Sequence, residues 1–97
     1  MRDLREEDRV RLAVDEAEDR WERAFDVWQS VTWTIMMDPT CGRAVNATGT
    51  VRDYVWHGAR SNGMPSVEVI YTIENDDLIV IEWAEFKDAP YHYHGTG

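Results

Sequence analysis

Residues 66–83 read SVEVIYTIENDDLIVIEW, and this stretch decides which fold the chain can form. From Val67 to Ile73 apolar and polar side chains mostly alternate, which is typical of a strand with one buried face. Leu78–Ile81 is apolar on both faces and is predicted to be an internal strand. The segment from Glu74 to Asp77 has a tight-turn composition, so the two strands are predicted to form a hairpin.

The segments before this hairpin complete the predicted sheet. Small and polar residues from Thr40 to Gly49 predict a loop, and a second, Gly-containing loop is predicted from His57 to Pro65. Between these loops lies a further segment of strand-forming composition. The predicted strands are Thr50–Trp56, Ser66–Ile73 and Leu78–Trp83, in an antiparallel sheet of three to four strands.

The N-terminal third of the chain is predicted to be a long amphipathic helix. It contains no Gly or Pro before Pro39, and Asp38-Pro39 is predicted to end the helical region, because Pro disfavours a helical residue ahead of it. We predict helix from Leu4 to Gln29, with Leu12, Ala13 and Phe25 widening its apolar stripe. The stripe has a seven-residue period and consists of Val10, Val14, Ala17, Trp21, Ala24, Trp28, Val31 and Ile35.

The length of this stripe raises a geometric problem. An unbroken helix over residues 4–36 would be about 50 Å long, whereas a compact chain of 97 residues is only about 30–35 Å across. The helix could bend into a hairpin near Asp15–Asp19, overhang and pair with a second copy, or stop near Ser30 before a strand at Val31–Ile35. The seven-residue period makes a homodimer through the N-terminal helix an expectation.

These patterns together predict a single α+β domain over residues 1–97. Residues 1–37 are predicted to be mainly helical, residues 50–86 to form antiparallel strands, and residues 89–97 to be a mobile tail.

Composition and charge limit the functional classes. The net charge is −9, which disfavours strong binding to nucleic acid or anionic membranes and favours a basic protein partner. One cysteine, Cys41, cannot form an intramolecular disulfide, and the N-terminal residues lack the apolar segment of a signal peptide. We therefore expect a cytoplasmic protein without a membrane span.

Residues that could perform chemistry are few. Six of the ten basic residues lie in residues 1–29, among ten acidic ones. His57 follows an aromatic strand, and His92 and His94 would point the same way on an extended tail, but no nucleophile motif or strong third metal ligand accompanies them. The sequence shows no phosphate-binding Gly loop and no zinc-type Cys/His spacing, so we expect no cofactor and no metal. The candidate partner-binding residues are Glu68, Glu82, Glu85 and Trp56.

From Trp28 to Phe86 the order of features resembles the RelE/ParE-type toxin superfamily. The resemblance lies in an apolar helix end followed by Asp38-Pro39-Thr40-Cys41-Gly42, in the Arg-bearing strand at Val51–Tyr54, and in Val69-Ile70-Tyr71-Thr72-Ile73 before an acidic turn. It implies that Val31–Met37 is helix. The chain departs from the family where a first strand is expected, because no strand signal precedes Leu4, and it carries Glu68 where a basic residue is common.

The resemblance implies a toxin-type protein of a bacterial toxin–antitoxin or mobile-element system, which binds a macromolecular target, with a degenerate ribonuclease as one form of this activity. Its protein partner would then be an antitoxin. If RNA is cleaved, the resemblance implies a site in which His57 or His92 moves protons and phosphate is held by Arg52, Arg60, Tyr71 and Lys87. The alternative hypothesis is a non-catalytic acidic inhibitor, such as a phage anti-defence or anti-CRISPR protein, that mimics nucleic acid on a basic protein surface.

Overall fold

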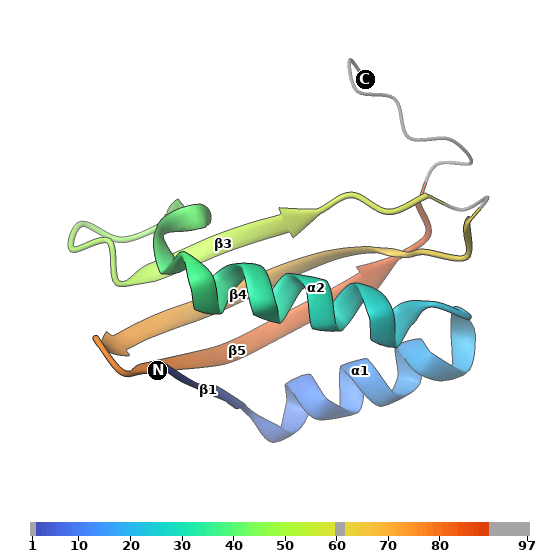
Figure 1. Cartoon of the computed structure of the whole chain (residues 1–97), viewed down its shortest axis with the longest axis horizontal. Helices are drawn as coiled ribbons and strands as arrows, with labels where there is room; N and C mark the ends of the chain where they lie inside the picture. The colour runs from blue at the N-terminus through green and yellow to red at the C-terminus, as the bar shows by residue number, and fades with distance from the viewer. Residues whose placement is uncertain (1, 60–61, 90–97) are drawn as a thin grey trace, which may run out of the picture.

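The computed structural model, in which residues 2–59 and 62–89 are described, consists of two helices packed on one face of a five-stranded sheet (Figure 1). The elements are β1 (Asp3–Glu6), α1 (Asp8–Arg20), α2 (Ala24–Met37), the 3-10 helix η1 (Pro39–Cys41), β2 (Arg43–Ala44), β3 (Val51–Trp56), β4 (Ser66–Asn75) and β5 (Leu78–Lys87). The α+β class is confirmed. The sheet is larger than the three to four strands predicted, and it is mixed rather than purely antiparallel.

The sheet has the strand order β1-β5-β4-β3-β2. Strands β2 to β5 are antiparallel, whereas β1 pairs in parallel with β5, placing Leu4 beside Ile79. The predicted helix start at Leu4 is therefore wrong. The strand was missed because Leu4 is its only apolar residue, too little for a periodic signal. Its second inward residue, Glu6, accepts a hydrogen bond of 3.1 Å from Trp28 Nε1.

The helical region is a hairpin of two helices rather than one long helix (Figure 1). Of the three outcomes considered, the hairpin is the one observed, but the chain turns at residues 21–23 and not near Asp15–Asp19. Trp21 has extended backbone angles (φ −123°, ψ 131°) while its N–H still bonds Ala17 O. The Arg23 N–H bonds Gly63 O at 3.1 Å, so the corner is held by a distant loop that local periodicity could not reveal.

The apolar stripe forms the core with β4 and β5. Val10, Val14, Trp28 and Ile35 are buried against strand residues that include Val69. This confirms that alternate residues of β4 face the helices. Val31–Met37 is helix and not strand, as the resemblance implied. Because the stripe is covered by the protein's own sheet, its length gives no reason to expect a homodimer.

The β4–β5 hairpin is confirmed, and its turn lies at Asp76–Asp77. β5 lies between β1 and β4, as its two apolar faces predicted, but it extends to Lys87. The register shifts so that Ile70 pairs with Trp83 and Tyr71 pairs with Ile81, which leaves Glu82 as an extra residue. This bulge is a local feature that alternation alone does not predict.

The predicted mobile tail and the expected absence of a membrane span can be compared with the described residues only. Ala89, the first residue of the predicted mobile tail, is 2% exposed, and residues 90–97 lie outside the described residues. Within the described part of the chain, no helix has the length and apolar character needed to cross a membrane.

Substitution of two tryptophans on α2 tests this arrangement. Trp28 is 4% exposed whereas Trp33 is 64% exposed. We expect Trp28→Ala to lower the free energy of unfolding by about 3–5 kcal/mol and the control Trp33→Ala to change it by less than about 0.5 kcal/mol. Urea unfolding monitored by circular dichroism measures both values. Equal losses in the two variants would contradict the placement of α2.

Candidate functional site

Arg52, which was predicted to hold phosphate, instead binds backbone carbonyls. Its Nη1 donates to Gly42 O at 2.8 Å and to Thr40 O at 3.2 Å, and its Nε donates to Gly49 O at 3.0 Å. These bonds close the loop between η1 and β3. They engage the Nε and Nη1 donors of the guanidinium and leave its two Nη2 N–H donors for a ligand.

Tyr71, the second residue of that predicted site, is buried in the core at 0% exposure. Its hydroxyl donates to Pro39 O at 2.5 Å and accepts from the Gly42 N–H at 3.1 Å. A Cβ on Gly42 would lie 2.8 Å from that hydroxyl, so the residue after Cys41 must be glycine. Burial raises the pKa of the Tyr71 hydroxyl far above its usual value, which keeps it neutral and structural.

The remaining predicted cations do not join Arg52. Lys87 pairs in register with Ser66 and lies on the sheet face opposite to Arg52, which pairs with Tyr71. Those two β4 positions are separated by roughly 16 Å along the strand. Lys87 Nζ is 3.1 Å from Glu85 Oε1.

His57 is exposed just beyond β3, while Arg60 and the predicted His92 lie outside the described residues. The described residues therefore form no phosphate-binding cluster of the predicted kind.

The predicted partner-binding carboxylates lie on the sheet face that the helices leave uncovered. Glu68 and Glu85 are paired across β4 and β5, and Glu68 also hydrogen-bonds Asp53 of β3. That hydrogen bond, followed by partial burial, raises the pKa of the Glu68 carboxyl. Asp53 Oδ2 is in turn 3.5 Å from Arg43 Nη2. The structure thus brings together two of the predicted residues and adds Asp53, which sequence reasoning did not select.

The other two predicted contacts are engaged within the protein. The Glu82 carboxylate, at the bulge, accepts a hydrogen bond from the Thr72 hydroxyl. Trp56 is half-buried against the core, with its Nε1 buried. Neither residue is presented to a partner in the way that the composition suggested.

An exposed apolar row on α2 was not predicted. Phe25, Trp33 and Met37 are 49%, 64% and 62% exposed, and with Gln29 they follow the four-residue spacing of a helix ridge. We call these four residues the α2 ridge. The prediction that Phe25 and Leu12 widen the buried stripe is wrong, because Leu12 is also 62% exposed. The signal was present in the sequence: Phe25 and Trp33 both lie off the seven-residue repeat.

Two depressions adjoin the α2 ridge. One of about 370 Å³ is lined by Gln29, Thr32, Trp33 and Met36. A furrow of about 190 Å³ between α1 and α2 is lined by Val14, Phe25 and Trp28, with Glu6, Asp15, Glu18 and the single cation Arg11 at its sides. The furrow is thus apolar in the middle and mainly acidic at its sides, an arrangement also found at protein interfaces.

Comparison with known proteins gives no family assignment. No protein-family model matches the chain, and no curated protein matches it. In the part of the chain that the structure describes, no group of three or more His, Cys, Asp or Glu residues is arranged to hold a metal ion. The function must therefore be argued from the surfaces themselves.

The carboxyl pair predicts a pH-dependent stability. Because folding raises the pKa of the Glu68 carboxyl, the protonated carboxyl stabilises the folded state. This stabilisation is complete below the unfolded pKa of about 4.3 and is lost as the pH rises through the folded value. We expect Glu68→Gln to be more stable than the wild type at neutral pH, with the difference vanishing in acid. The exposed Glu74→Gln is the control. Urea unfolding from acid to neutral pH measures this difference in the free energy of unfolding. Parallel profiles of stability against pH for wild type and Glu68→Gln would contradict the prediction.

Proposed function

We propose that this chain is a RelE/ParE-like toxin-type protein that acts by binding a macromolecule and does not cleave RNA by itself. The motif resemblance supports the family, and so does the order of strand, two helices and strands. The N-terminal strand whose apparent absence set the sequence apart from the family is present as β1.

The position of Arg52 is the observation that supports the proposal that the chain does not cleave RNA by itself. Phosphodiester cleavage needs preorganised positive charge at the scissile phosphate, because negative charge accumulates there in the transition state. The Nε and Nη1 donors of Arg52 are held by the carbonyls of Thr40, Gly42 and Gly49, and Lys87 pairs with Glu85. Glu68 and Asp53 place negative charge on the uncovered face of the sheet, which repels a phosphate backbone.

The α2 ridge is the proposed binding surface. Trp33 is the most exposed large apolar side chain among the described residues, and Trp is enriched among the residues that dominate binding energy at interfaces. The acidic rim beside the ridge fits a partner with an apolar centre and basic flanks. An antitoxin or target protein with such a surface would cover Phe25, Trp33 and Met37 together.

A second candidate function, the acidic inhibitor, is favoured by a different observation. The exposed side of α1 and the turn after it carries a dense set of carboxylates. These exposed residues are Asp8, Asp15, Glu16, Glu18, Asp19 and Glu22. An inhibitor that mimics nucleic acid would use this side of α1 and would need the α2 ridge little, so the two candidates make different demands on Trp33.

A binding assay with paired variants tests the proposal. The protein encoded beside this chain is the partner to use, measured by calorimetry over a range of salt concentrations. We expect Trp33→Ala to weaken binding about 30-fold, the control Leu12→Ala to bind like the wild type, and the affinity to fall as salt rises. If binding survives Trp33→Ala but is lost when Asp15 and Glu18 become Lys, the inhibitor is the better reading.

The non-catalytic claim has its own test. The purified chain should leave RNA intact in a cleavage assay, with and without ribosomes, under conditions in which it is folded. Robust cleavage by the wild-type chain would overturn the claim that the cations are unavailable.

A further inference from the structure

The outer edge of β5 is only partly covered by another strand. β1 pairs with Leu78–Ile81 and then ends at Glu6, whereas β5 continues to Lys87. β4 pairs with β5 along its other side over its whole length. The first carbonyl beyond β1, Glu82 O, is bonded by Arg9 Nε at 2.6 Å. Among the described residues, Trp83–Lys87 has no strand on its outer side, and its alternate backbone N–H and C=O groups face outward.

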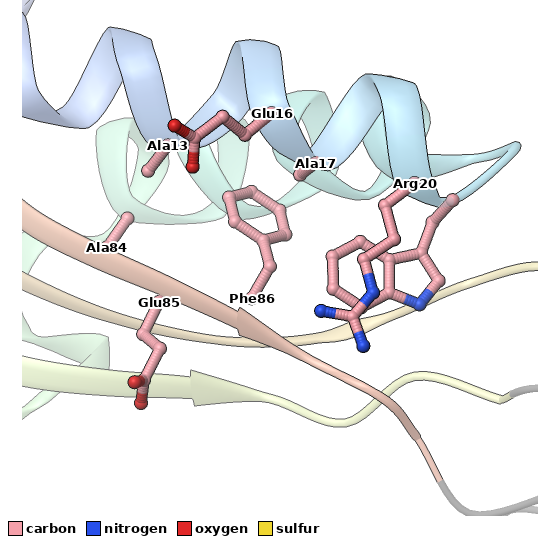
Figure 2. Close-up of a pocket in the computed structure, with 8 residues that line it drawn as sticks. Ala13, Glu16, Ala17, Arg20, Ala84, Glu85 and Phe86 are labelled. Carbon is pink, nitrogen blue, oxygen red and sulfur yellow. The ribbon is translucent and has the colours of Figure 1, made fainter.

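A cavity of about 270 Å³ lies between this edge and α1. Figure 2 shows Ala84 and Phe86 pointing toward α1, where Ala13 and Ala17 face them, and Glu85 pointing away. We call this space the edge cavity. Arg20, at one end, is 3.3 Å from Asp88 and stacks 4.5 Å from the Trp21 ring, so the nearest cation is already paired. The cavity lies on the flank of α1 opposite to the furrow beside α2.

Side chains on the two faces of an added strand would contact different groups of this protein. Side chains directed toward α1 would enter the edge cavity, against Ala13, Ala17 and Phe86. Glu16 of α1 also lines this cavity. Side chains directed the other way would lie on the uncovered face beside Glu85, whose carboxylate pairs with Lys87, next to the hydrogen-bonded carboxyls of Glu68 and Asp53. Apolar residues suit the first side and basic residues suit the second.

We propose that the Trp83–Lys87 edge binds an extended segment of a partner protein in which apolar and basic residues alternate. The segment would add a strand beside β5, beyond the end of β1, and complete the edge of the sheet. Backbone hydrogen bonds would supply the affinity, and the edge cavity and the carboxylates would select the alternating pattern. This site does not use the α2 ridge, so its failure would leave the proposed function untouched.

A synthetic peptide of alternating Val and Arg is the probe. Amide NMR spectra of the full chain, recorded at low salt during a titration, should show slowed hydrogen exchange at Trp83–Lys87 and no change along the α2 ridge. Within an added strand, all Val N–H groups face one edge and all Arg N–H groups face the other. N-methylation of one residue type should therefore abolish binding, and N-methylation of the other should leave it intact.

Matched variants of the chain locate the contact. Ala13→Leu keeps a good helix former and fills the edge cavity, so it should weaken peptide binding about tenfold; the control Ala47→Leu, in an exposed loop, should not. Glu85→Gln should weaken binding about twofold to fivefold, and Glu74→Gln should not. Equal affinity in Ala13→Leu and wild type, or loss of binding with both methylated peptides, would overturn the proposal. So would protection of Trp83–Lys87 in a dimer without peptide, because a second copy would then occupy the edge.

Discussion

Burial of one continuous apolar stripe on a sheet shorter than the stripe is the constraint on which the rest of the structure depends. The protein measures 38 × 31 × 22 Å, whereas the stripe laid out as a straight helix would be about 50 Å long. The turn at residues 21–23 solves this mismatch by folding the stripe into two helices. α1 then packs on β5, and Trp28 of α2 contacts Phe86 of β5.

The exposed surfaces are those sides of the helices and of the sheet that do not face the core. Trp28 faces the core and contacts Phe86, with ring centroids 5.8 Å apart, while Trp33 lies on the outside of the same helix. Phe25, Trp33 and Met37 are exposed along one ridge of the same helix, and this ridge is the surface proposed to bind a partner. On the opposite side of the sheet, Glu68, Asp53 and Glu85 make the uncovered face acidic. These two features are the basis on which a protein partner is proposed in place of a phosphate ligand.

Much of the architecture could be predicted because it follows from local sequence patterns. Alternation in β4, the two-sided strand β5 and the Asp38-Pro39 stop are properties of neighbouring residues, and each was read correctly. β1 could not be predicted, since a strand with one apolar residue depends on a partner that is distant in sequence. The corner at Trp21 depends on Gly63 in the same way. Of the candidate site residues, Glu68 and Glu85 lie together, whereas Arg52 and Tyr71 are structural, a role that becomes visible only when loop carbonyls are placed around them.

The parallel pairing of β1 with β5 also has a consequence for synthesis on the ribosome. Translation makes Asp3–Glu6 before its partner residues Leu78–Ile81, which lie far along the sequence. The helices and β3 can form local contacts earlier, yet the sheet cannot acquire its first strand until β5 has left the exit tunnel. Closure of β1 onto β5 therefore waits until β5 has been made, and it brings together two segments far apart in the chain at the entropic cost of a long loop.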